Sequence, residues 1–209
     1  MDREREIYIS LDVETDGKIC GLSSMLSLGA AAVAWDREKR QWDISSTFSA
    51  NLVPLPNCTQ DADTMKFWSD NPVAWKTATS NQREAALVMQ DFRSWLCDIG
   101  RKWNRRAVAV GAPAAFDFPF VRYYLIRFTG TDEPFRHSCL DTKSIASTLL
   151  KLPYYASSKS SYPKSWSADK LPHTHVAVDD AVEQGYMLAR MIDSQYGIGG
   201  AVEPGVLCY

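Results

Sequence analysis

The stretch EIYISLDVET, residues 6–15, decides how the rest of the chain is interpreted, because a strand pattern ends in two acids. Its apolar start predicts a short β-strand that ends at Asp12. Side chains two residues apart on a strand point the same way, so Asp12 and Glu14 should project together. Adjacent carboxylates repel unless a cation lies between them. The pair indicates either a site for a hard cation such as Mg²⁺ or Mn²⁺, or a solvated loop entry.

The segments after this strand predict an antiparallel meander. Residues 27–36 and 42–54 have strand patterns, and the charged residues 36–40 between them suit a hairpin loop. Residues 63–78 resemble a short helix broken near Pro72. We therefore expect three antiparallel strands at the start of the fold.

Alternating helices and strands follow the meander. Residues 81–103 predict a helix with Asn81 as N-cap and Glu84 three residues on. Its apolar positions form one stripe: Ala86, Leu87, Met89, Phe92, Trp95, Leu96 and Ile99. Residues 107–113 predict a buried strand, and residues 116–130 predict a helix ended by Gly130.

A short strand and a helix are expected over residues 139–152, and a last helix over residues 177–197. This order of elements predicts one α/β domain with a mixed sheet over residues 1–195, followed by a C-terminal tail at 196–209.

The composition is that of an ordinary globular protein, with 209 residues, 45% hydrophobic residues and a net charge of −2. This charge gives no basic field for nucleic acid, so such a substrate would need a local patch. The five cysteines are an odd number without close pairs, which argues against a disulfide framework and favours a reducing cytoplasm. The start of the chain lacks a signal-peptide pattern, and no apolar run is long enough to span a membrane.

Two further acidic positions stand at predicted helix starts. Asp117 follows a buried strand and a loop of small residues, although an acid in a first helical turn is favoured in any case. His175 lies five residues before Asp180, so a loop histidine and a first-turn acid could face one cleft. Asp179 is about 100° around the helix and is the better candidate for a cap or a solvent-facing acid. His173 is interpreted as a loop residue.

The combination of these positions is more informative than any one of them. Four carboxylates from three segments can converge at one edge of an α/β sheet and hold two divalent ions, roughly 3.5–4 Å apart. A neutral imidazole beside them has a pKa near working pH and can accept a proton from water. The chemistry expected from this set is hydrolysis of a phosphodiester.

Three motifs carry a resemblance to a known family: SLDVETDG (10–17), AAFDFPFVRYYL (114–125) and HTHVAVDDAVEQG (173–185). In order and spacing they resemble the three exonuclease motifs of the DEDD superfamily, in its histidine-bearing branch. That branch includes a polymerase proofreading subunit, ribonuclease T and oligoribonuclease. The resemblance covers roughly residues 6 to 193. It implies a ribonuclease H-like fold, with a five-stranded mixed sheet flanked by helices.

The resemblance also implies roles for individual residues. Asp12, Glu14, Asp117 and Asp180 would be metal ligands for two Mg²⁺ or Mn²⁺ ions, and His175 would be the general base. Thr15 and Gly17 lie where the family contacts the terminal nucleotide. A departure occurs before the second motif, where Ala112 and Pro113 replace a usual His-Asn pair and so put one substrate contact in doubt.

The implied activity is 3′–5′ exonuclease hydrolysis of single-stranded nucleic acid, releasing nucleoside 5′-monophosphates. Phe67 and Trp68 either stack on bases or pack on the core, and core packing is the more common role. RNA is slightly favoured because of ribonuclease T, with a DNA-end exonuclease as the alternative. A non-catalytic nucleic-acid-binding module would be expected to lack one of the five site residues.

Several relatives are dimers, so a homodimer is compatible with the resemblance. The serine- and lysine-rich residues 151–170 are either a border of the active site or a solvated loop.

Overall fold

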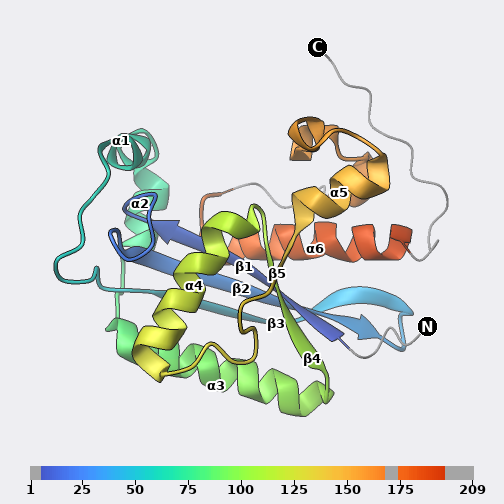
Figure 1. The fold of residues 1–209 in the computed structure, drawn as a ribbon, viewed down its shortest axis with the longest axis horizontal. Helices are drawn as coiled ribbons and strands as arrows, with labels where there is room; N and C mark the ends of the chain where they lie inside the picture. Colours follow the sequence, from blue (N-terminus) through green and yellow to red (C-terminus); the bar gives the residue numbers. More distant parts are fainter. Residues whose placement is uncertain (1–5, 168–173, 196–209) are drawn as a thin grey trace.

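A computed structural model of the chain describes residues 6–167 and 174–195. Its centre is a five-stranded sheet in the order β3-β2-β1-β4-β5 (Figure 1). The strands are β1 (Glu6–Thr15), β2 (Met25–Asp36), β3 (Gln41–Asn51), β4 (Arg106–Gly111) and β5 (Cys139–Asp141). β1 to β3 form the expected antiparallel meander, whereas β4 runs parallel to β1 and β5 runs parallel to β4. The prediction of a mixed sheet is confirmed.

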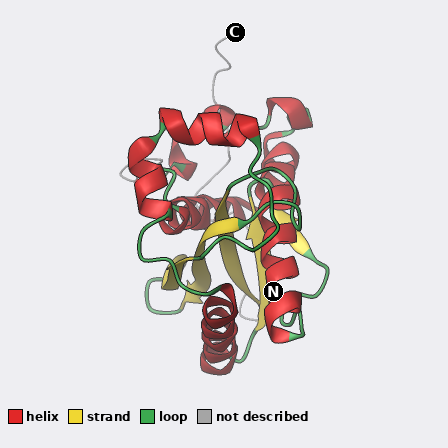
Figure 2. Ribbon diagram, turned by 90° about the vertical axis from the view of Figure 1, so that its left-hand side faces the viewer, coloured by secondary structure: helices red, strands yellow, loops and turns green. Residues whose placement is uncertain are grey.

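Helices cover both faces of this sheet (Figures 1 and 2). They are α1 (Ala62–Asp70), α2 (Pro72–Ala78), α3 (Ala85–Trp103), α4 (Ala114–Thr129), α5 (Thr142–Leu150) and α6 (Ala177–Gln195). α3 and α4 share the main core with one face of the sheet, and α6 packs across β1, β2 and β3 on the other. None of the helices in the described parts of the chain has the length and apolar character needed to cross a bilayer.

The alternation of β1 determines which side chains reach each face. Ile7, Ile9 and Leu11 are fully buried in the core shared with α3 and α4. Ser10 points the other way, where its hydroxyl accepts a hydrogen bond from Gln184 of α6 at 2.9 Å. Since side chains alternate along a strand, the even-numbered acids at the end of β1 lie on the α6 side.

The first strand is longer than its sequence predicts. β1 continues to Thr15 instead of ending at Asp12, because Val13 and Glu14 still pair with Leu28 and Ser27 of β2. Both acids of the first motif are therefore held in a sheet and not in a loop.

The predicted start of α3 is wrong. Asn81 has a φ of 49° and does not cap the helix, which begins at Ala85 after Glu84. The cause is tertiary: the backbone of Arg83 exchanges hydrogen bonds of 2.9 Å with Asn51 and Val53, which keeps this segment extended. The buried stripe also shifts: Leu87 is 52% exposed, and Ala85 and Val88 are buried instead.

Two other boundaries agree with the sequence, whereas β4 ends at Gly111 instead of Pro113 and α4 begins at Ala114 instead of Phe116. The break at Pro72 separates α1 from α2, and α4 ends at Gly130, whose φ of 75° suits a residue without a side chain. Cys20, Cys58, Cys97 and Cys139 are free thiols. His173 and the tail expected at 196–209 lie outside the described residues.

Candidate active site

The first two acids project from the end of β1. Asp12 pairs with Gly29 of β2, and Glu14 pairs with Ser27. As whole residues Asp12 and Glu14 have intermediate exposure, in contrast to the fully buried Leu11 between the sheet and α4. The period of two along the strand thus places both acids on one side, as their spacing predicts.

The third acid joins α4 to the same strand. Asp117 lies in the first turn of α4 and is only 4% exposed. Its Oδ1 accepts a hydrogen bond of 3.2 Å from the backbone N–H of Val13, which lies between Asp12 and Glu14. The second motif is therefore attached directly to the first.

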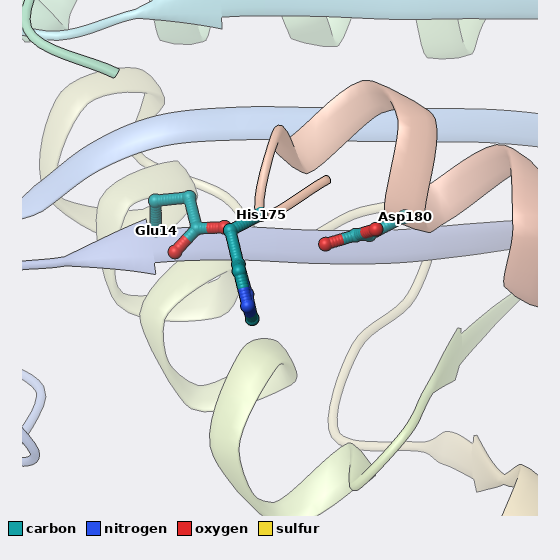
Figure 3. A group of neighbouring side chains, drawn as sticks. All are labelled: Glu14, His175 and Asp180. Carbon is teal, nitrogen blue, oxygen red and sulfur yellow. The ribbon is translucent and has the colours of Figure 1, made fainter. Parts of the chain in front are cut away.

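The third motif brings a histidine and an acid to this place. Asp180 lies in the first turn of α6 and is 4% exposed, and its Oδ1 accepts a hydrogen bond of 3.4 Å from the backbone N–H of Thr174. Glu14, His175 and Asp180 each offer one ligand atom within 4.8 Å of the others (Figure 3). The end of β1, the start of α4 and the start of α6 therefore meet at this place.

Burial and mutual repulsion disturb the titration of this cluster. Burial raises the pKa of Asp12 well above its ordinary value, and the charges of Asp117, Glu14 and Asp180 raise it further. Burial likewise raises the pKa of Glu14 to about 8, with Asp180 and Asp117 adding to the rise. Burial raises the pKa of Asp117 to about 7, although the hydrogen bond from Val13 opposes the change. The cluster favours a bound cation, because a cation allows all of these acids to be ionised.

Two residues to which the sequence assigns no role, Gly29 of β2 and Gln184 of the third motif, hold α6 against the sheet. A Cβ on Gly29 would lie 2.1 Å from the backbone of Ala177, so only glycine permits this approach. The side-chain amide of Gln184 donates to Ser10 Oγ at 2.9 Å and lies within 3.4 Å of the Leu11 and Val110 carbonyl oxygens. Sequence reasoning missed both roles, although a glycine inside a strand is a known sign of close backbone approach.

A cavity of about 290 Å³ adjoins the cluster. Its lining includes Glu14 and also Thr15 and Gly17, which the resemblance places at the terminal nucleotide. Phe67 and Trp68, for which the sequence leaves base stacking and core packing open, line it as well. Trp68 is 2% exposed, and its indole N–H donates to the Thr15 carbonyl at 2.9 Å, whereas Phe67 is 38% exposed. The two aromatic residues therefore differ, since Trp68 supports the wall and Phe67 presents surface to the cavity.

Asp16 is a further buried acid that the sequence did not single out. Its Oδ1 accepts a hydrogen bond of 2.5 Å from the backbone N–H of Ser24, and its carbonyl accepts one of 2.9 Å from Asp61. These bonds fix the turn after β1 against the start of α1. The only signal for this role in the sequence is the position of Asp16 directly after the first motif.

The serine- and lysine-rich segment is packed against the fold where it is described. Three short 3₁₀ turns, Tyr154–Ala156, Lys159–Ser161 and Lys164–Trp166, replace the expected loop, and Ser157 and Trp166 are buried. The ammonium group of Lys159 pairs with Glu183 of α6 at 2.7 Å. Its charge also lowers the pKa of Asp12, against the larger effects of burial and the neighbouring acids. The segment therefore brings a positive charge to the border of the acidic cluster.

Asp179 behaves as its position on the helix predicts. It is exposed, and its Oδ2 accepts a hydrogen bond of 3.0 Å from the hydroxyl of Thr174 just before α6. It thus supports the start of the helix, while Asp180 faces the cluster.

Comparisons with known proteins were made on sequence and on fold. No family model matches the chain. The chain is 30% identical over 145 residues to the 3′–5′ DNA exonuclease Cap18 of Escherichia coli, covering 69% of this chain and 70% of that protein. The nuclease domain of 3′hExo, a DEDDh family member bound to rAMP, has a TM-score of 0.65 at 10% identity over 97% of both chains. Pop2p of S. pombe, in a form with Mg²⁺ and Mn²⁺ bound, has a TM-score of 0.56 at 15% identity, covering 92% of this chain and 85% of that chain.

These likenesses support two conclusions of different kinds. The solved structures show that the sheet and its helices form a ribonuclease H-like fold. The identity to Cap18 extends across most of both chains and shows the relationship in sequence. The chain belongs to the DEDDh family of 3′–5′ exonucleases.

Proposed function

We propose that this exonuclease removes nucleoside 5′-monophosphates one at a time from single-stranded 3′ ends in a reaction that depends on divalent metal ions. The proposed ligands are Asp12, Glu14, Asp117 and Asp180, and the proposed general base is His175. The observation that carries the proposal is the convergence of Glu14, His175 and Asp180 within 4.8 Å. The hydrogen bond from Val13 to Asp117 and the charge interactions of Asp12 support including these two acids in the proposed ligand set.

The donor set fits hard cations. Carboxylate oxygens are the ligands that Mg²⁺ and Mn²⁺ prefer. Burial raises the pKa values of Asp12, Glu14 and Asp117, and repulsion by neighbouring acids adds to the rise for Asp12 and Glu14. When bound, two such ions would supply an activated water and stabilise the departing 3′ oxygen. The metal-bound form of Pop2p, which shares the fold, supports the same proposal.

The protein's own groups would orient the substrate and move the proton. The imidazole of His175 would accept a proton from the attacking water, because a neutral histidine can do so near pH 7. Thr15 and Gly17 would contact the terminal nucleotide in the cavity, and the exposed face of Phe67 would stack on its base. The bond from Trp68 to the Thr15 carbonyl would keep that wall rigid.

A single-stranded end is the form of substrate that this site would accept. The cavity of about 290 Å³ lies directly beside Glu14, and a paired terminal base could enter it only after unstacking from its neighbours. A frayed or unpaired 3′ end avoids that cost in free energy.

We propose DNA as the preferred substrate and RNA as the second candidate. The resemblance to ribonuclease T slightly favours RNA. We give more weight to Cap18, which is 30% identical to this chain and is a DNA exonuclease. The rAMP bound to 3′hExo supports RNA, at 10% identity. The homodimer and the cytoplasmic location stay predictions, to be tested by light scattering and by cell fractionation.

One assay tests the proposal. The protein is incubated with 5′-labelled single-stranded DNA and RNA of the same sequence, with Mg²⁺, Mn²⁺ or EDTA. We expect a ladder that shortens from the 3′ end only with metal, and faster on DNA. Equal shortening of the two strands would remove the proposed preference for DNA, and faster shortening of RNA would reverse it. Folded protein that cuts neither strand with metal present would overturn the proposal.

A further inference from the structure

The proposed general base is in contact with an aromatic side chain that faces the nucleotide cavity. The rings of Phe67 and His175 meet edge to face, with centroids 5.0 Å apart and planes at 85°. Phe67 also contacts Trp68 at 5.2 Å, and Trp68 is bonded to the Thr15 carbonyl. A continuous set of contacts therefore links the end of β1 to His175 through α1.

The backbone of His175 has an unusual conformation. Its φ of 53° lies in the left-handed region, which residues other than glycine adopt only when their surroundings favour it. It lies in the short connection before α6, between Thr174 and the helix start at Ala177, and not within regular secondary structure. The imidazole therefore extends from a connecting segment, and the ring of Phe67 is one of its neighbours.

Phe67 has two surfaces in different environments. One edge or face meets His175, and another part lines the cavity of about 290 Å³ and contributes to its 38% exposure. A base that enters the cavity would cover this exposed part and restrict the rotation of the ring. A restricted Phe67 ring would in turn restrict the imidazole that it contacts.

We propose that Phe67 is a positioning residue that couples occupation of the nucleotide cavity to the orientation of His175. With a 3′-terminal nucleotide bound, Phe67 holds the imidazole in the orientation that accepts a proton from water. With the cavity open, this restraint is weaker. The inference rests on the proposed role of His175 as the general base. It adds a reason why hydrolysis of the nucleic acid requires a 3′-terminal nucleotide bound in the cavity.

Phe116 provides a matched control. It lines the same cavity as Phe67, but its ring contact is with Phe120, at 5.5 Å. Phe67→Leu and Phe116→Leu each remove an aromatic side chain from the cavity wall, and only the first removes the ring beside His175. Phe67→Tyr keeps a ring at that position and serves as the conservative variant.

The kinetic test separates KM from kcat. We expect Phe67→Leu to lower kcat at saturating substrate by about tenfold or more, since misplacing a reacting group is costly. Phe116→Leu should act mainly by raising KM, and Phe67→Tyr should recover most of the lost kcat. Equal losses of kcat in the two leucine variants, with both proteins folded by circular dichroism, would overturn the inference.

A second readout does not depend on activity. The chain has three histidines, so the ring protons of His175 can be assigned in the NMR spectrum by comparison with His175→Gln. Addition of a saturating nucleoside 5′-monophosphate should shift this signal in the unaltered protein and in Phe116→Leu, but not in Phe67→Leu. A signal that moves equally in all three proteins would exclude the coupling.

The role of His175 as the base and its coupling to Phe67 can be tested separately. If His175→Gln keeps full kcat, His175 is not the base, whatever the NMR spectra show. If His175→Gln loses kcat but the Phe67 variants behave like Phe116→Leu, the catalytic role stands and the coupling is wrong.

Discussion

Gly29 lies so close to Ala177 that a Cβ on the glycine would come within 2.1 Å of the Ala177 backbone. Gly29 is the partner of Asp12 across the sheet, and Ala177 is the first residue of the helix that carries Asp180. This contact brings the first and third motifs together. The distance between two acids of the candidate site thus depends on the absence of a side chain at a residue that carries no reactive group.

Gly29→Ala should therefore disturb both the fold and the reaction. The added methyl group must push α6 from the sheet, at a cost of about 1–3 kcal/mol in the free energy of unfolding. Exonuclease activity measured at a temperature where the variant is folded should also fall, because Asp180 moves with the helix. Urea denaturation and initial rates provide the two measurements.

Gly100→Ala is the control for that substitution. Gly100 lies inside α3, and nothing is within 4 Å of the position that its Cβ would take. Alanine should raise the free energy of unfolding by about 0.5–1 kcal/mol, because it favours a helix more than glycine does. A Gly29→Ala protein as stable and active as Gly100→Ala would contradict the role of the close contact.

Replacement by asparagine should have different effects on cleavage at Asp179 and at Asp180. Asp180→Asn removes a buried carboxylate from the cluster and should abolish metal-dependent cleavage. Asp179→Asn should leave cleavage intact, since Asp179 is exposed and asparagine can still accept the bond from Thr174. Product release and Mn²⁺ binding are measured for both variants, and similar losses in both would refute the assignment.

His175→Gln tests the general base apart from the metal ligands. Loss of a positioned base should lower kcat by about 10²–10⁴-fold. The four carboxylates remain, so the variant should keep most of its affinity for Mn²⁺. Single-turnover rates and calorimetric titration with Mn²⁺ measure the two properties, and an unchanged single-turnover rate would exclude His175 as the base.

The stability of the metal-free protein should fall as the pH rises. The pKa values of Asp12, Glu14 and Asp117 in the folded protein lie above those of the unfolded chain, so folding takes up protons between the two sets of values. This contribution to stability is fully present below about pH 4 and is lost as the pH rises through about 8. Thermal unfolding in EDTA across this range measures the decline.

Bound Mg²⁺ and the substitution Asp12→Asn should each reduce the fall in stability with rising pH. Saturating Mg²⁺ should stabilise the protein more at about pH 8 than at about pH 5, because the ionised acids then have a cation. Asp12→Asn in EDTA should give a shallower fall of Tm with pH than the unaltered chain. The same slope with EDTA and with Mg²⁺ would show that the cluster does not bind the ion.

Much of the candidate site could be predicted from the sequence, because the direction of a side chain on a strand or helix is set within that one segment. The period of two along a strand puts Asp12 and Glu14 on one side, whatever the rest of the chain does. Helical geometry likewise separates Asp179 from Asp180, and Gly130 ends α4 through its own backbone freedom.

Errors arose where distant segments override local preference. The cap expected at Asn81 fails because Arg83 is held extended by backbone bonds to residues near the end of β3. β1 outlasts its apolar pattern because β2 continues to pair with it. In both cases hydrogen bonds from a neighbouring segment outweigh the signal of the local sequence.

The sequence by itself determined which residues are the candidates for the chemistry and which way they face on their own elements. Only the tertiary structure decided how closely these elements approach: Gly29 against Ala177, Gln184 between α6 and the sheet, and Phe67 against His175. The physical reason is that periodicity is a property of one segment, whereas approach depends on the side-chain volumes packed between two segments.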